Sequence, residues 1–159
     1  MLVDNALEQI FELELSARDI AGQCCNTVVK PSVTAGWGLH AGEQDIRSGQ
    51  LVAIMSWGKV SREYAPGTQK VRGGYQRYCS NPDGESAWRG GCANEADNAA
   101  AVNCVIVEVP PKGRRQCVMT VLVAVCTIRA GEEVLVDYGV MEHGEASWPH
   151  RECGRGMGQ

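Results

Sequence analysis

The sequence lacks the features that mark a membrane or secreted protein. Its 159 residues hold no apolar run long enough to cross a bilayer, and 118–125 is among the longest. The N-terminus has no charged stretch followed by an apolar one, so no secretory signal peptide is predicted. Internal repeats and low-complexity tracts are absent as well. We therefore expect a soluble, intracellular protein that does not bind membranes, in the nucleus or the cytoplasm.

Basic patches and paired cysteine motifs are also missing. Lysines and arginines are scattered and the net charge is −4, so direct nucleic-acid binding is not expected. None of the eight cysteines forms a C-x-x-C pair, which excludes a zinc ribbon and a thioredoxin-type redox motif. Several cysteines lie in strand-like runs, as Cys104 does before 105–107, and we expect them to be reduced, buried thiols.

The residues that are present predict one mostly-β domain. Apolar residues make up 44% of the chain, enough for a core, and the length fits a single domain. Helical spacing of apolar residues predicts a helix over 5–20, with a capping box at Asn5–Glu8. The polar segment 61–91 is too long for a plain loop, so we expect an insertion with a function or a hidden helix. Strands are predicted at 28–30, 51–57, 103–109, 116–126 and 133–137.

The last predicted strand ends on a phenol. In RAGEEVLVDYG, residues 129–139, a turn at Ala130-Gly131 leads into the β-branched and aliphatic run 134–136, and Asp137-Tyr138-Gly139 closes it. One interpretation is a packed core tyrosine with a single hydrogen bond. The other is that the Tyr138 hydroxyl faces a reaction.

Three stretches resemble the SET domain in their order and spacing. AGWGLHAGEQDIRSGQLV (35–52) and IRAGEEVLVDYG (128–139) are close to the family pattern. In GGCANEADNAAAVNC (90–104), Glu95 replaces the family's histidine, and the spacing to Asn103-Cys104 is longer than usual. SET domains are S-adenosylmethionine-dependent protein lysine methyltransferases. The resemblance therefore implies a mostly-β, β-clip-like SET fold of short strands with a pseudoknot over 26–150, after an N-terminal helical extension (1–25) and before a short tail (151–159).

The resemblance also implies a cofactor site for S-adenosyl-L-methionine. The turn Gly36-Trp37-Gly38 would hold the methionine part, although a G-x-G turn taken alone is structural. Backbone of Asn94 and Glu95 would pair with the adenine, and turn chemistry is the alternative for Asn94. Tyr138 would contact the cofactor and act as the catalytic residue, which orients the transfer rather than serving as a strong base.

The same resemblance implies roles for residues near the substrate and in the tail. Tyr75 and Tyr78 would bind the substrate lysine. Val136 stands where family members often carry Phe or Tyr, and its small side chain would leave room for a second or third methyl group. Trp148 would either anchor the tail on the core or cover the adenine as a lid.

Zinc is not expected. The family's tail cysteines are reduced here to Cys153, and a site would have to use Cys104, Cys153 and a histidine such as His150.

The sequence favours two functions over a third. The leading hypothesis is methyl transfer to the ε-amine of lysine in a protein partner, a histone or another protein. The alternative is a non-catalytic SET-like module that binds a protein or peptide, because the Asn94-Glu95 motif departs from the family. An unrelated all-β structural protein is a third possibility. Substrate, number of methyl groups and oligomeric state are left open by the sequence.

Overall fold

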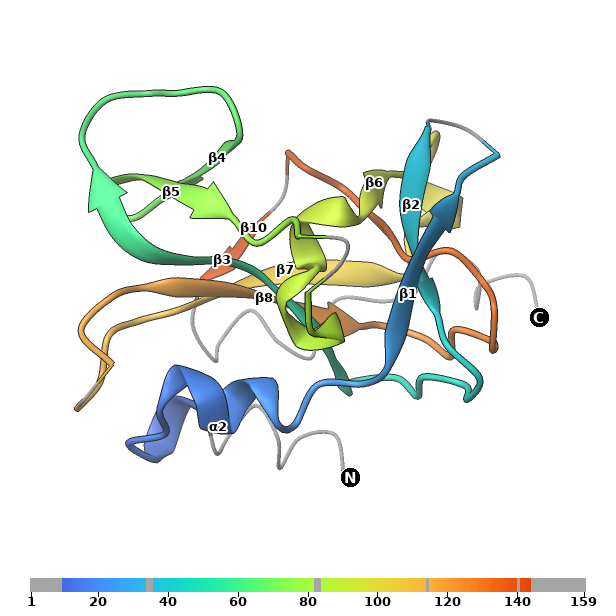
Figure 1. Cartoon of the computed structure of the whole chain (residues 1–159), viewed down its shortest axis with the longest axis horizontal. Coiled ribbons are helices and arrows are strands. Elements are labelled where there is room, and N and C mark those ends of the chain that lie inside the picture. Colours follow the sequence, from blue (N-terminus) through green and yellow to red (C-terminus); the bar gives the residue numbers. More distant parts are fainter. Residues whose placement is uncertain (1–9, 34–35, 82–83, 114, 140, 144–159) are drawn as a thin grey trace.

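A six-stranded sheet forms the centre of the structure (Figure 1). The computed structural model describes residues 10–33, 36–81, 84–113, 115–139 and 141–143, the last three by their backbone. The strand order is β10-β7-β8-β3-β5-β4, and every pair is antiparallel except the parallel pair β10–β7. The bounds are β3 Leu51–Ser61, β4 Thr68–Val71, β5 Gly74–Tyr78, β7 Cys104–Val109, β8 Met119–Ala124 and β10 Met141–His143.

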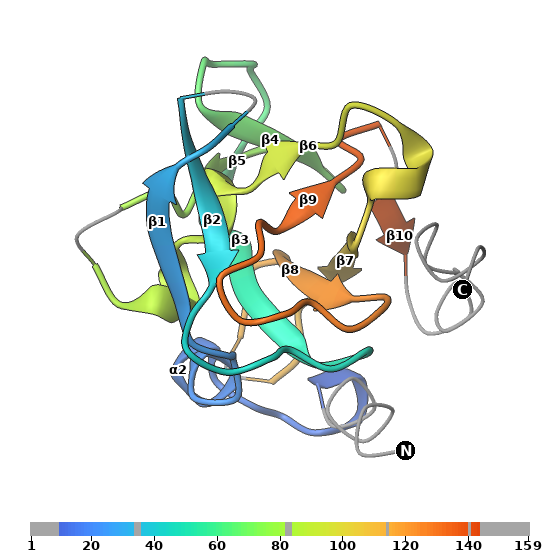
Figure 2. The ribbon, with the colours of Figure 1, turned by 90° about the vertical axis from the view of Figure 1, so that its right-hand side faces the viewer.

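Two small sheets lie beside this central sheet. The antiparallel pair β1 (Thr27–Pro31) and β2 (Trp37–Ala41) forms the first. The parallel pair β6 (Asn94–Glu95) and β9 (Leu135–Val136) forms the second, and Figure 2 shows it next to β2. Three single-turn 3-10 helices complete the described elements, at Ser86–Trp88, Gly90–Cys92 and Ala99–Ala101.

The central strands are buried on both faces. All six residues of β7 and all six of β8 are buried, which explains why their sequences are continuous apolar runs rather than alternating ones. Val105 and Val107 pack into one core cluster together with Ile10 and Ile20 of the N-terminal segment. Ile106, between them, packs into a second cluster on the opposite face, with β2 and β9. The sheet therefore separates a supporting N-terminal layer from the layer that carries β2, β6 and β9, where the three SET-like stretches lie.

A buried polar network fixes β5 to the sheet. The Ser56 hydroxyl donates to Gln76 Oε1 (2.9 Å) and lies 2.6 Å from Thr120 Oγ1. The Gln76 amide donates to the carbonyl oxygens of Gly58 (2.7 Å) and Val118 (2.6 Å). Because unpaired polar groups would be costly at this depth, the network sets the position of β5, whose last residue is Tyr78.

The mostly-β prediction is confirmed, with corrections in detail. The hairpin predicted around 110–113 is present as β7–β8, but β9 is shorter than the predicted strand. Segment 61–91 holds the β4–β5 hairpin and two 3-10 helices, so it is not an irregular loop. The expectation of reduced thiols holds for six cysteines and is wrong for Cys126, which is disulfide-bonded. Within the described residues, no helix is long and apolar enough to span a membrane.

The N-terminal helix is interrupted. Residues 10–12 are helical, 13–16 are not, and α2 covers Ala17–Ala21. The break occurs at Ser16, whose hydroxyl accepts the N–H of Asp19 (3.1 Å) while the Asp19 carboxylate accepts the N–H of Ser16 (3.1 Å). This capping box starts a new helix. The predicted capping box at 5–8 lies outside the described residues.

Two cations at the β7–β8 turn hold the interrupted segment on the sheet. The Lys112 ammonium donates to the carbonyl oxygen of Phe11 (2.8 Å) and to that of Glu12. The Arg115 guanidinium, buried at 4% exposure, donates to Leu15 O (2.8 Å) and Pro110 O (3.0 Å). Phe11 and Glu12 are the last residues of the helical piece 10–12, where helix carbonyl groups have no intrahelical partner, and Leu15 lies in the break between the two helical pieces. The cations therefore replace the missing hydrogen bonds.

We expect Arg115→Ala to lower the free energy of unfolding by about 2–4 kcal/mol, because two carbonyl groups lose a charged donor in a buried site. Lys112→Ala should cost about 1 kcal/mol or less, since its bonds are partly solvent-exposed. Urea unfolding followed by circular dichroism measures both values. Equal losses in the two variants would contradict the assignment of Arg115 as the main anchor.

Candidate functional site

Residues 134–136 pass between two segments that are distant in the sequence, and this arrangement is called the crossing below. The Val134 N–H donates to Leu39 O of β2 (2.8 Å), and the Ala96 N–H, just after β6, donates to Val136 O (2.8 Å). The segment thus runs between β2 and β6 and is bonded to each (Figure 2). This contact pattern is the one expected for the predicted pseudoknot.

Asn103 closes the crossing with its side chain. Its amide nitrogen donates to the Glu133 carbonyl oxygen (2.8 Å), and its amide oxygen accepts the Leu135 N–H (2.8 Å). Its own backbone N–H donates to Leu135 O (3.0 Å), and the residue is 1% exposed. Asn103 therefore satisfies backbone groups of 133–135 that the β6–β9 pair leaves without a strand partner.

The Glu133 carboxylate connects the G-x-G turn to β6. One oxygen accepts the Asn94 amide (3.0 Å) and the other accepts the Ser32 hydroxyl (3.0 Å). A Cβ on Gly38 would lie 2.3 Å from Glu133 Oε1, so a side chain at this position would displace the carboxylate from its present place. The sequence analysis did not assign Glu133 to the site. The feature that could have indicated it is a charged residue directly before a buried strand.

The G-x-G turn presents an open surface. Gly36 has φ +51°, and no heavy atom lies within 4 Å of a Cβ built on it. The Trp37 side chain is 65% exposed, while its carbonyl oxygen accepts the Asn94 amide (3.0 Å). Asn94 therefore bonds across to another segment, and the local turn interpretation of this residue is wrong.

Tyr138 lies directly beyond β9, next to β6. Its hydroxyl donates to the carbonyl oxygen of Ala93 (2.5 Å), yet the residue is 45% exposed. Burial raises the pKa of the Tyr138 phenol above its usual value, and the nearby Tyr78, Glu95 and Cys92 raise it further. A packed core tyrosine would not be this exposed. The phenol is a neutral, oriented group at a surface opening.

The four tyrosines of the chain are neighbours in series, from Tyr75 through Tyr64 and Tyr78 to Tyr138, and are called the tyrosine row below. The rings of Tyr64 and Tyr75 meet edge to face with centroids 5.5 Å apart. Burial and the neighbouring Tyr64 raise the pKa of Tyr78, and Tyr78 in turn acts on Tyr138. Tyr75 and Tyr78, predicted to be near the substrate, are thus brought into one group with Tyr138 by β5.

The remaining predicted residues are buried or lie outside the described residues. Val136 is fully buried in the second core cluster, against which Tyr78 packs. Cys104 is also fully buried. Among the described residues, no group of three or more His, Cys, Asp and Glu side chains could hold a metal ion. Trp148, His150 and Cys153 lie outside the described residues.

Comparison with known proteins identifies the fold. No protein-family model and no curated protein matches the sequence. A solved structure of a Plasmodium falciparum protein assigned to the histone methyltransferases is similar, with TM-score 0.51 and 17% identity over 72% of this chain and 98% of that one. KRYPTONITE, solved with mCHH DNA, an H3(1–15) peptide and SAH, gives TM-score 0.53 and 16% identity over 73% of this chain and 24% of that one.

CpSET8 from Cryptosporidium gives TM-score 0.54 and 15% identity, over 84% of this chain and 70% of that one. These similarities show the fold: the chain has the SET-domain fold that its three motifs predict.

We expect Glu133→Ala to lower the free energy of unfolding by about 1–3 kcal/mol, because the Asn94 amide loses one of its two acceptors and the Ser32 hydroxyl loses the carboxylate. Glu133→Gln keeps an acceptor for Asn94 and should lose less. Glu132→Ala is the matched control, since the Glu132 carboxylate accepts an exposed turn N–H at Arg129 (3.3 Å). Urea unfolding measures all three. A larger loss in Glu132→Ala than in Glu133→Ala would contradict the connecting role of Glu133.

We expect Glu95→Gln to lower the pKa of Tyr138 while leaving it above the usual phenol value, because burial is the larger cause of the shift. Titration of 13C-labelled tyrosine by NMR measures this pKa, and Tyr138→Phe identifies the signal. Asp137→Asn is the control: Asp137 is adjacent in sequence, but its carboxylate accepts the Gly139 N–H (2.9 Å). A Tyr138 titration that is the same with and without Glu95 would show that the two side chains do not interact.

Proposed function

We propose that this chain is a protein-lysine N-methyltransferase that uses S-adenosyl-L-methionine. The observation that carries the proposal is the setting of Tyr138: a half-exposed phenol, bonded to Ala93 O, where the β6–β9 crossing meets the row of tyrosines. The SET fold supports it, and two of the solved structures with that fold carry methyltransferase chemistry in their descriptions, as a histone methyltransferase and as a complex with SAH.

The residues around the G-x-G turn fit the cofactor. When bound, S-adenosylmethionine supplies an electrophilic methyl group on a cationic sulfonium. The open backbone at Gly36 and the exposed Trp37 ring offer surface to its methionine part. Backbone of Asn94 and Glu95 would hold the adenine, and the exposed Glu95 carboxylate adds a negative charge near the cation. Trp148 would cover the adenine from the tail.

Tyr138 would orient the amine of the substrate lysine. Because its O–H donates to Ala93 O, its oxygen lone pairs remain available to accept an N–H from that amine. The amine lone pair can then point away from Tyr138, toward the methyl donor. Orientation of this kind converts a bimolecular encounter into an aligned one and accounts for a large part of an enzymatic rate.

The tyrosine row would deliver the amine without acting as a base. A free lysine has a pKa of about 10.4, and desolvation between aromatic rings favours its neutral form. The pKa of Tyr138 is raised, so the phenol stays protonated at neutral pH and does not remove a proton from the ammonium. The proton leaves to solvent at the exposed edge of Tyr138. We propose Tyr75 and Tyr78 as channel residues, and Val136 behind them as the position that sets how many methyl groups fit.

Glu95 favours one alternative. It replaces the family's histidine in the segment proposed for the adenine, so the chain could bind a lysine-bearing protein without transferring methyl groups. The two functions differ in one property that can be measured directly, the affinity for the cofactor.

Isothermal titration of S-adenosylmethionine into the purified wild type tests the proposal. We expect binding, weaker binding by Trp37→Ala, and near wild-type binding by Tyr138→Phe, because the phenol serves the transfer more than the cofactor. In a radiolabelled methyl-transfer assay on a protein lysate, Tyr138→Phe should lose at least about 100-fold in rate. No binding at millimolar cofactor would overturn the enzyme proposal in favour of the non-catalytic module.

A further inference from the structure

A long groove leads away from Tyr138 on the side of the β4–β5 hairpin. Its first part is a cavity of about 720 Å³ lined by residues 69–72, Glu108, Tyr138 and Gly139. A second cavity of about 410 Å³ continues it past Arg72 and Glu108, which line both. The second part runs along the turn region of the β7–β8 hairpin, where Pro110, Pro111 and Val118 line it. Tyr138 therefore belongs both to the crossing and to one end of this groove.

The groove is lined by more positive than negative charge. Lys59, Lys70 and Arg72 are exposed along it, and within the described residues none of the three forms an ion pair. Among the described residues that line it, Glu108 alone is acidic; it is 6% exposed, and its carboxylate accepts the Arg72 N–H (3.1 Å). The chain as a whole carries −4. Since charges are screened over about 8 Å at physiological salt, the local cations determine what the groove attracts.

The lining suits an extended peptide better than a nucleic acid. Val60, Val71 and the two prolines give the groove an apolar part that the side chains of a peptide can cover. Three cations are few for a phosphate backbone, whose binding usually needs a larger number of such contacts. The groove also ends at Tyr138, where a peptide lysine would have to arrive.

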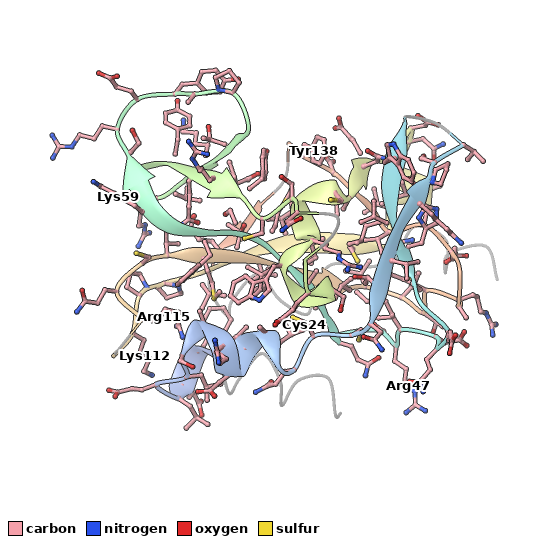
Figure 3. The ribbon with its side chains drawn as sticks, viewed as in Figure 1. Cys24, Arg47, Lys59, Lys112, Arg115 and Tyr138 are labelled. Atoms are coloured by element: carbon pink, nitrogen blue, oxygen red, sulfur yellow. The ribbon has the colours of Figure 1, made fainter. Side chains whose placement is uncertain are left out.

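We propose that this groove binds the substrate segment beside the target lysine and selects acidic side chains there. The proposal rests on the proposed methyltransferase function and adds to it the class of substrate: a lysine flanked on one side by Asp or Glu. Lys70 and Arg72 would contact the acidic residues nearest the lysine, and Lys59 those further along. Figure 3 shows Tyr138 and Lys59 both in the upper half of the view, with Lys59 at the left side of the molecule. A purely basic tail would be repelled by the same three side chains.

Fluorescence anisotropy with labelled peptides tests the proposal without requiring methyl transfer. Three peptides share one central lysine and differ only in their flanks, which are rich in Glu, Gln or Arg. We expect the Glu peptide to bind roughly tenfold more tightly than the Gln peptide, with an affinity that falls as salt rises, and the Arg peptide to bind most weakly. Equal affinity for the three peptides would overturn the proposal.

Charge variants locate the binding. Lys70→Gln/Arg72→Gln should abolish the preference, and Lys70→Glu/Arg72→Glu should shift it toward the Arg peptide. Arg47→Glu is the matched control, because Arg47 is an exposed cation at the opposite end of the molecule in Figure 3. Circular dichroism confirms that each variant is folded. If Arg47→Glu lost the preference for the Glu peptide to the same extent, the effect of charge would be non-specific, and the assignment to the groove would be overturned.

Two further measurements separate this proposal from its alternatives. Titration of S-adenosylmethionine into the Lys70/Arg72 variants should give wild-type affinity, because neither residue is near the G-x-G turn. If the wild type binds the Glu peptide but not the cofactor, the groove assignment stands and the enzyme proposal fails. If a single-stranded oligonucleotide displaces the Glu peptide and itself binds more tightly, the groove is a nucleic-acid site and the peptide proposal fails.

Discussion

The site depends on the crossing of residues 133–136 with two other parts of the chain. This segment is buried or half-buried, and its backbone groups are satisfied by Leu39, by Ala96 and by both ends of the Asn103 side chain. Unsatisfied backbone groups at such depth would cost free energy comparable to a lost hydrogen bond each. The same bonds hold the G-x-G turn, β6 and Tyr138 together. Stability and site geometry thus rest on one set of interactions.

The central sheet fixes where β5 and its tyrosines lie relative to the crossing. Its strands are buried on both faces, with the N-terminal segment packed on one face and the crossing on the other. Lys112 and Arg115 secure the N-terminal layer, and the Ser56–Gln76 network secures β5. The N-terminal segment therefore supports the site by covering the face of the sheet that the site does not use.

Charge is divided between the two sides of Tyr138. Carboxylates of Glu95 and Glu133 lie on the side of the G-x-G turn, where a cationic cofactor is proposed. Lysine and arginine side chains line the groove on the other side. A phenol with a raised pKa stays neutral between these regions, so it can orient a ligand from one side toward the other without becoming charged itself.

The sequence by itself determined the buried strands, the hairpin near residue 110, the G-x-G turn and the position of Tyr138, because these depend on local apolar runs and turn residues. Only the tertiary structure decided what Asn94 and Glu133 do, since their bonds join residues 39 to 101 positions apart. It also gathered the four tyrosines and brought three scattered cations to one groove. The break before α2 has a local and a distant part: the capping box of Ser16 and Asp19 is local, but the cations that bind the free carbonyl groups come from 100 residues away. Local patterns carry no information about such partners.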